Sequence, residues 1–382
     1  MQNPNIVFIG MDTHKGHSSI SYLLDGYGNE PVYFGQIKST KTALQKLVRQ
    51  LQSKFSNATL HFVYEAGPCG YWMYRLLTQL NQVYYVIAPS LIPKKSGDRV
   101  KTDKRDSMAL VKHLKNGDLT PITVPAAEDE SIRDLSRARE RAMHDLNDAR
   151  FQLKALLLRN HVQYKGTANW SKKHIRWLTE IILPYPAQQM VLQEAIQTIN
   201  EKTERLNRLD EALLYHAKKW RFYPVVKAIQ AMRGVAFLVA VGTIAELGDL
   251  TRFDHPAKLM SYVGLTPTEY SSGSTRRQGG ITKCGNTRAW RLLVEGAFSY
   301  RYSANISTDM QKRQEGLSKE VIDIAWKAQL RLCKRYQYLS KRGKNGNVIK
   351  VAIAREMLAY IWSIALEIPL RKAEPCVVRV PS

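Results

Sequence analysis

The sequence predicts an α/β domain at the N-terminus, a region of long helices after it, and a mostly helical C-terminal domain. Within the first 120 residues, apolar runs typical of strands alternate with amphipathic segments typical of helices. Residues 127–219 instead carry apolar side chains at alternating spacings of three and four. At 382 residues the chain is longer than one hydrophobic core usually serves. We expect an α/β domain at 1–125, long helices at 126–222, a further domain at 223–370 and a tail at 371–382.

Three strands open the predicted α/β domain, and the first ends in Asp12. A helix follows, with Thr40 or Thr42 available as its cap and with Leu44, Leu47 and Leu51 on one face. A strand ending near Glu65, a helix and a last strand complete a mixed sheet that helices cover. The expected strands are 5–12, 17–25, 32–37, 59–67 and 83–89, and the expected helices are 40–55 and 71–80.

The middle region carries two seams of apolar residues that resemble those of coiled coils. Thr203 and Asp210 interrupt the second seam, which favours a short antiparallel hairpin or a dimer contact over a long rod. Pro184 and Pro186 end a helix between the two seams. The first seam contains Ile132, Leu135, Ala142, Leu146, Ala149, Leu153 and Leu156, and the second contains Leu192, Ile196, Ile199, Leu206 and Leu213.

The C-terminal region begins with a helix, a tight turn at Gly234 and a second helix that stops at Gly248. The glycine-rich stretch 264–286 is expected to be a basic loop. Helices are then expected at about 287–302, 319–340 and 346–366.

Composition favours a nucleic-acid partner. The chain has 57 Lys and Arg residues against 33 Asp and Glu residues, a net charge of +24 that attracts polyanions. Solubility and contact with a membrane surface remain alternative reasons for this charge. The four cysteines lie far apart without a CxxC pair, which favours a reducing compartment. Without a signal peptide or an apolar run of roughly 20 residues, the sequence predicts a soluble cytoplasmic protein that does not span a membrane.

Four carboxylates are candidates for a metal site. Asp12 and Glu65 each follow an apolar strand, at the edge where α/β sheets present catalytic groups. Asp103 and Asp106 are three residues apart, so on a helix they share a face with Cβ atoms about 5–6 Å apart. Neighbouring carboxylates repel each other unless a cation neutralises them, and oxygen ligands suit Mg²⁺. Two such ions about 3.5–4 Å apart can clamp the attacking and leaving oxygens of a phosphoryl transfer.

The aspartate pair also has a simpler interpretation as part of a solvated helix face. Lys101, Lys104 and Arg105 surround the two acids and can offset their charge, and the spacing alone does not decide between the alternatives. In a metal site, the same three cations would contact phosphate. His14 likewise is a candidate phosphate contact, a group that orients a metal ligand, or ordinary polar surface.

These acidic segments resemble a known family. "GMDTHK", "YEAGPCG" and "KTDKRDSMALVKHLKNGDL" resemble the ordered D, E, D, D signature of the RuvC-like domain in DEDD insertion-sequence transposases, a group that includes the Piv invertases. The resemblance implies an RNase H-like (RuvC-like) fold for the N-terminal domain. It also implies that Asp12, Glu65, Asp103 and Asp106 are catalytic and bind Mg²⁺.

A second candidate site lies in the segment "YSSGSTRRQGGITKCGNTR". Its glycines allow backbone amides to approach a phosphate, and Arg276, Arg277, Lys283 and Arg288 can neutralise it. A flexible basic loop without chemistry is the alternative. A serine here would be a nucleophile only with help from a base or a metal, and no neighbouring histidine supplies that help.

Residues 233–297 resemble the second conserved domain of the same transposases. In relatives the serine before the glycine of the "SG" pair is the nucleophile, which implies that Ser272 is catalytic here. Relatives usually carry Pro-Gly-x-Gly in the helical hairpin, where this chain has Arg233, Gly234, Val235 and Ala236. The resemblance covers roughly residues 5–160 and 225–310.

The resemblance implies a recombinase that cuts and rejoins DNA through a covalent phosphoserine. It further implies a homo-oligomer, a dimer or a tetramer, and, in some members of the family, a structured noncoding guide called a bridge RNA. Two other functions remain open: a RuvC-like or RNase H-like nuclease that uses water, and a nucleic-acid-binding protein without catalysis.

Overall fold

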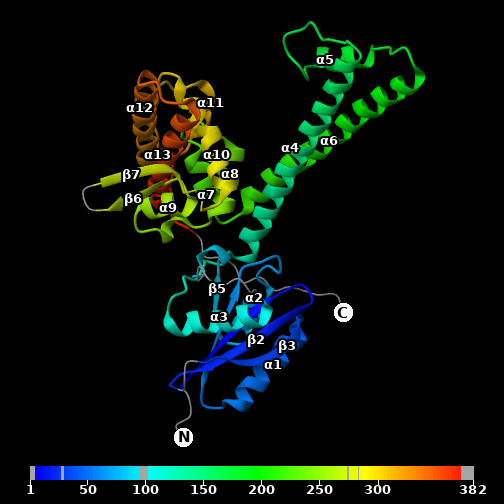
Figure 1. Ribbon diagram of the computed structural model, residues 1–382. Coiled ribbons are helices and arrows are strands. Elements are labelled where there is room, and N and C mark those ends of the chain that lie inside the picture. The colour runs from blue at the N-terminus through cyan, green and yellow to red at the C-terminus, as the bar shows by residue number, and fades with distance from the viewer. Residues whose placement is uncertain (1–4, 27–29, 94–101, 273–274, 283, 371–382) are drawn as a thin grey trace. The chain divides into compact units, whose positions relative to one another are not determined.

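The chain forms two compact units, Met1–Val124 and Pro125–Ser382. The computed structural model describes residues 5–26, 30–93, 102–272, 275–282 and 284–370 (Figure 1). Lys101, Lys283 and the tail expected at 371–382 lie outside these residues. Among the helices of the described ranges, none combines the length and the apolar character needed to cross a membrane.

A five-stranded mixed sheet forms the centre of the first unit. Its strands lie in the order β3-β2-β1-β4-β5. The first three strands pair antiparallel, whereas β1 with β4 and β4 with β5 pair parallel. The strands are β1 (Ile6–Thr13), β2 (His17–Leu24), β3 (Val32–Lys38), β4 (Thr59–Glu65) and β5 (Val83–Ile87). This arrangement confirms the mixed sheet predicted from the sequence and is consistent with an RNase H-like domain.

Helices pack on the sheet as their apolar spacing predicts. The side chain of Thr40 caps α1 (Lys41–Lys54) by accepting a hydrogen bond from the Ala43 backbone N–H at 3.3 Å, so Thr40 and not Thr42 is the cap. Leu44, Leu47 and Leu51 of α1 are buried in the core of the sheet. The remaining helices of this unit are α2 (Trp72–Gln79), the short 3₁₀ helix η1 (Pro89–Leu91) and α3 (Asp103–Asn116).

Gly10 permits α3 to lie unusually close to β1. A Cβ atom at Gly10 would be 2.4 Å from the Ser107 carbonyl oxygen and 2.7 Å from Val111 Cγ2. A buried hydrogen bond of 2.8 Å between the hydroxyls of Ser21 and Ser107 joins α3 to β2 as well. The absent side chain at position 10 therefore sets the distance between the start of α3 and the end of β1.

The second unit begins with two long antiparallel helices, α4 (Ala127–Arg159) and α6 (Pro186–Lys219), which pack side by side (Figure 1). Arg139 pairs with Asp210 at 2.7 Å and Asp145 with Arg205 at 3.1 Å, so the contact positions run in opposite directions along the two helices. The apolar seams of the two helices pack against each other, with Ala142–Leu157 of α4 buried against Leu192–Leu206 of α6. Asp210, which interrupts the second seam, is thus a partner of α4. The short helix α5 (Lys172–Thr179) connects the two.

The rest of the second unit is mostly helical and packs around the buried helix α13. A tight turn separates α7 from α8, and Gly248 ends α8, where the sequence placed both features. The elements are α7 (Tyr223–Ile229), α8 (Phe237–Leu247), η2 (Leu250–Arg252), α9 (Pro256–Val263), β6 (Pro267–Ser272), β7 (Thr275–Ile281), α10 (Thr287–Ala297), η3 (Phe298–Arg301), α11 (Thr308–Gln314), α12 (Lys319–Lys341) and α13 (Gly346–Leu366).

The glycine-rich stretch 264–286 is not the loop expected from its composition, because most of it forms the antiparallel hairpin β6–β7. Threonine and tyrosine at positions 268, 270 and 275 favour extended backbone. Gly279 lets the strands approach, since a Cβ there would be 2.4 Å from Thr268 Oγ1. Glycine here thus serves strand packing.

We predict that Gly10→Ala will destabilise the first unit by about 1–3 kcal/mol, because the added methyl group forces α3 away from β1. The measurement is chemical unfolding of the full-length chain. Gly16→Ala is the matched control, since a Cβ at Gly16 meets no described atom within 4 Å. Equal effects of the two substitutions would contradict this account of the packing.

Candidate functional site

Asp12 and Glu65 lie at the same edge of the sheet. Strands β1 and β4 are parallel, and Met11 is in register with Tyr64, so the next residue of each strand is one of the two acids. Asp12 is only 8% exposed, whereas Glu65 is half-buried. The strand-end positions predicted for these two carboxylates are therefore observed.

The N-terminus of α3 presents the two aspartates. Thr102 caps the helix by accepting a hydrogen bond from the Arg105 backbone N–H at 3.3 Å, which places Asp103 and Asp106 in its first turn. Negative charge is stabilised at this end of a helix by the unpaired backbone N–H groups and the helix dipole. The first turn thus tolerates two acids that would repel each other elsewhere.

Two histidines of the β1–β2 turn bring Asp12 and Asp103 together. His14 Nε2 is 3.3 Å from Asp12 Oδ2 and 3.4 Å from Asp103 Oδ1. His17 Nε2 contacts the other oxygen of Asp103 at 3.2 Å. Asp12, His14 and Asp103 offer atoms within 4.8 Å of one another that could ligate a metal. His17 was not a candidate in the sequence, although its place three residues after His14 in a tight turn is a usable signal.

The electrostatics of this cluster favour a bound cation. Burial raises the pKa of the Asp12 carboxyl above its ordinary value; His14 opposes this effect, and repulsion from Asp103 and Asp106 adds to it. The hydrogen bond from His17 holds the pKa of Asp103 below its ordinary value. Buried Asp12 Oδ2 has the ion-pair contact with His14 but makes no well-formed hydrogen bond to any described residue. A divalent ion fits this donor set, because it would satisfy the buried oxygen and neutralise the repulsion.

Two of the three basic residues beside the aspartates, Lys104 and Arg105, lie within the described part of the chain. Lys104 and Arg105 are exposed on the first turn of α3, and Lys104 Nζ lies 5.2 Å from the centre of the Tyr33 ring. Lys101 lies outside the described residues. The described cations are accessible to a polyanion.

Ser272 is the last residue of β6, where its side chain is exposed and its Cα pairs with that of Thr275. The neighbouring Ser271 donates its hydroxyl hydrogen bond to Glu269 Oε1 at 2.8 Å. Arg277 is exposed on β7. Gly273, Lys283 and the side chain of Arg276 lie outside what the structure describes.

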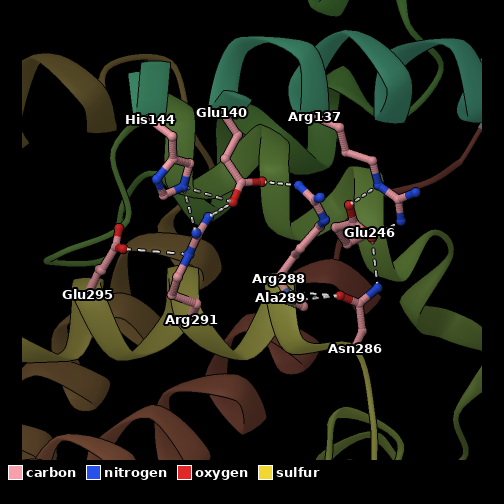
Figure 2. Close-up of polar contacts among 9 residues, drawn as sticks. All are labelled: Arg137, Glu140, His144, Glu246, Asn286, Arg288, Ala289, Arg291 and Glu295. Atoms are coloured by element: carbon pink, nitrogen blue, oxygen red, sulfur yellow. Dashed lines mark hydrogen bonds and ion pairs between the residues drawn. The ribbon is translucent and has the colours of Figure 1, made fainter. Parts of the chain in front are cut away.

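A buried carboxylate fixes the segment that follows the hairpin (Figure 2). Glu246 receives hydrogen bonds from Arg137 Nε and Nη2 at 2.7 and 2.8 Å, and from Asn286 Nδ2 at 2.7 Å. Burial would raise the pKa of Glu246, but the hydrogen bonds from Arg137 and Asn286 outweigh it and hold this pKa below its ordinary value. Asn286 also caps α10 by accepting hydrogen bonds from the Arg288 and Ala289 backbone N–H groups, each at 3.1 Å.

Arg288, predicted to contact nucleic acid, is engaged within the protein. Its guanidinium pairs with Glu140 of α4, which also pairs with Arg291 (Figure 2). His144 lies beside the same carboxylate, with its Nε2 3.7 Å from Glu140 Oε1. A phosphate at Arg288 would therefore have to compete with Glu140.

The turn before α8, at Arg233–Ala236, serves packing. Gly234 has a φ of +78°, and a Cβ there would be 2.2 Å from the Gly296 carbonyl oxygen of α10. Arg233 donates hydrogen bonds to the Ser303 carbonyl oxygen at 2.8 Å and to Asn305 Oδ1 at 2.9 Å. The glycine that this chain retains is thus the one that the helix contact requires.

Comparison with known proteins decides the family. A family model described as "Transposase IS116/IS110/IS902 family" matches residues 226–313, and one described as "Transposase" matches residues 9–162. A Sinorhizobium fredii protein named as a candidate transposase, y4qE, is 40% identical to this chain. The match covers 94% of this chain and 88% of y4qE. The chain belongs to the IS116/IS110/IS902 family of transposases.

Other relatives carry the same description. The transposase for insertion sequence element IS1533 of Leptospira borgpetersenii is 27% identical over 88% of this chain and 98% of its own length. The transposase for insertion sequence element IS1111A of Coxiella burnetii is 25% identical over 60% of this chain and 63% of its own length. The resemblance to DEDD insertion-sequence transposases is thereby confirmed. In this transposase the acidic cluster lies in the first matched segment and Ser272 in the second.

We predict that Asp12→Asn will stabilise the metal-free transposase at pH 7, by on the order of 1 kcal/mol. Because the pKa of Asp12 is raised on folding, its ionised form costs stability above the folded-state pKa. This cost disappears as the pH falls below the ordinary aspartate value, so the difference between variant and wild type should shrink in acid. Thermal unfolding in EDTA between pH 3 and pH 8 measures this difference.

With excess divalent cation, the wild type should instead be more stable than Asp12→Asn, because only the wild type retains the full site. Binding at a hundredfold excess over Kd stabilises a protein by about 2.7 kcal/mol. Asp25→Asn, at an exposed carboxylate of the same unit, is the control and should respond to neither pH nor metal in this way. An Asp12→Asn variant less stable than wild type in EDTA at pH 7 would refute the burial argument.

Proposed function

We propose that this protein is a DNA transposase that cuts and rejoins strands of its insertion sequence through a covalent phosphoserine at Ser272, assisted by Mg²⁺ on four carboxylates. The convergence of Asp12 and Asp103, with a buried Asp12 oxygen that has no described hydrogen-bond partner, carries the proposal. Membership of the transposase family supports DNA as the substrate.

Asp12, Glu65, Asp103 and Asp106 are the proposed ligands. Bound there, Mg²⁺ supplies Lewis-acid stabilisation of the charge on the transferring phosphoryl group. The protein's own contribution is to hold the carboxylates ionised and close together. The cap of α3 and the contacts of the two histidines favour the ionised form of Asp103, which is the form that binds a cation.

Ser272 is proposed as the nucleophile because it is the serine of the family's "SG" pair, and its side chain is exposed at the hairpin end. In the reaction a bond forms between Ser272 Oγ and phosphorus, the serine proton is released, and a P–O bond to one deoxyribose breaks. The departing deoxyribose oxygen takes up a proton. A hydroxyl from a second DNA end then displaces the serine, so the number of phosphoester bonds is conserved and no external energy source is needed.

The basic side chains are proposed to bind nucleic acid. Lys104, Arg105 and Arg277 are exposed and can contact phosphates. Arg276, Lys101 and Lys283 have the same proposed role from the sequence. A net charge of +24 is compatible with binding DNA and RNA together. The structured noncoding guide RNA and the homo-oligomer are proposed from the family resemblance.

We predict that Ser272→Ala will abolish covalent protein–DNA adducts and lower strand transfer at least 1,000-fold. The assay incubates the full-length protein and its RNA with labelled insertion-sequence ends, then detects adducts on a denaturing gel. Ser271→Ala is the matched control, because that hydroxyl bonds to Glu269, and it should retain the adducts. Strand cleavage by Ser272→Ala at the wild-type rate would instead favour a nuclease that uses water.

We also predict that a discrete RNA will copurify with the protein expressed together with its flanking DNA. Ribonuclease treatment should remove target cleavage, and the same RNA added back should restore it, since base pairing would supply the target sequence. An RNA of equal length and scrambled sequence is the control. Unchanged cleavage after complete RNA removal would eliminate the guide from the proposal.

A further inference from the structure

A single ring nitrogen of His14 faces the carboxylates of both Asp12 and Asp103. The same atom, Nε2, is 3.3 Å from Asp12 Oδ2 and 3.4 Å from Asp103 Oδ1. A ring nitrogen carries one hydrogen, which cannot point fully at two acceptors at once. Buried Asp12 Oδ2 correspondingly remains without a hydrogen-bond partner among the described residues.

The spacing of these three atoms fits neighbouring ligands of one ion. Ligands at about 2.1 Å from an octahedral ion lie roughly 3 Å apart when they are adjacent, which is close to the two observed separations. We infer that His14 is itself a metal ligand, so that the centre presents one imidazole nitrogen together with its carboxylate oxygens and prefers Mn²⁺ to Mg²⁺. This inference rests on the proposed metal-dependent function and adds a ligand to it.

The backbone of the β1–β2 turn holds His14 in place. The His14 N–H donates to the His17 carbonyl oxygen at 2.9 Å, and the His14 carbonyl oxygen accepts from Ser39 Oγ at 2.7 Å. The side chain is half exposed, so it can be removed without opening a cavity in the core. A ligand fixed by its backbone needs little reorganisation to bind.

His17 has a different role. Its Nε2 contacts Asp103 Oδ2, whereas His14 faces Asp103 Oδ1 and Asp12. His17 is therefore a positioning residue that orients Asp103. The pair provides a matched control, because the two histidines lie on one turn and only His14 is inferred to coordinate.

The preference among metals follows from the donor atoms. Mg²⁺ binds oxygen ligands and water almost exclusively, whereas transition metals accept imidazole. Replacing His14 should thus weaken Mn²⁺ binding much more than Mg²⁺ binding. Without a nitrogen ligand, the preference for Mn²⁺ should be largely lost.

The test is electron spin echo spectroscopy of Mn²⁺ added at one equivalent to the untagged full-length protein at pH 7.5, which detects nitrogen bonded to the metal. We expect a nitrogen coupling in wild type and in His17→Ala, and its loss in His14→Ala. Titration calorimetry should show Mn²⁺ binding weakened about tenfold or more in His14→Ala, with Mg²⁺ affinity changed less than about threefold.

Failure of the inference is distinguishable from failure of the proposed function. Tight Mn²⁺ binding without a nitrogen coupling in wild type, or a coupling that persists in His14→Ala, would overturn the role of His14 and leave the carboxylate centre intact. Absence of Mn²⁺ binding in wild type, or binding unchanged in Asp103→Asn, would overturn the metal centre and His14 with it.

Discussion

The close contact between α3 and β1 at Gly10 is the constraint on which the acidic site depends. It brings the first turn of α3 to the strand end that carries Asp12. The buried hydrogen bond between Ser21 and Ser107 holds the same helix against β2. Carboxylates brought together in this way repel each other and lose hydration, so the fold maintains them at a cost in stability that a bound cation would offset.

The second unit also contains a buried carboxylate, Glu246, whose charge is neutralised by an arginine of the same unit. Glu246 is buried and would be unstable as an isolated charge, but Arg137 pairs with both of its oxygens. Removing one partner of a buried ion pair typically costs 3–5 kcal/mol, because the other charge remains without compensation. Asn286 joins this pair to the start of α10, and Gly285 packs against the backbone of Tyr262 and Val263. A rigid support therefore lies directly after the hairpin that carries Ser272.

Much of this structure follows from local sequence signals. Apolar periodicity predicted the mixed sheet, the helices α1 and α2 of the first unit and the long helices α4, α6, α12 and α13 of the second, because burial of a continuous apolar face dominates each of these elements. The strand-end acids were likewise visible, since Asp12 and Glu65 occupy positions defined by their own strands, whereas the cap of α3 at Thr102 was not predicted. The hairpin β6–β7 was missed because glycine and serine content indicates turns, whereas strand pairing and the fit of Gly279 against Thr268 depend on the partner strand.

What the sequence did not predict are contacts between elements far apart in the chain. His17 lies 86 residues from Asp103, and Glu140 lies 148 residues from Arg288, so no spacing rule connects them. The prediction that Arg288 contacts nucleic acid was based on its charge alone, whereas in the structure Arg288 pairs with Glu140 of the same chain. The same logic separates the two acidic environments of this protein. Glu246 is paired with the permanently charged Arg137 and is structural. Asp12 is paired with His14 and keeps a buried oxygen without a hydrogen bond among the described residues, a property expected of a carboxylate that binds a metal.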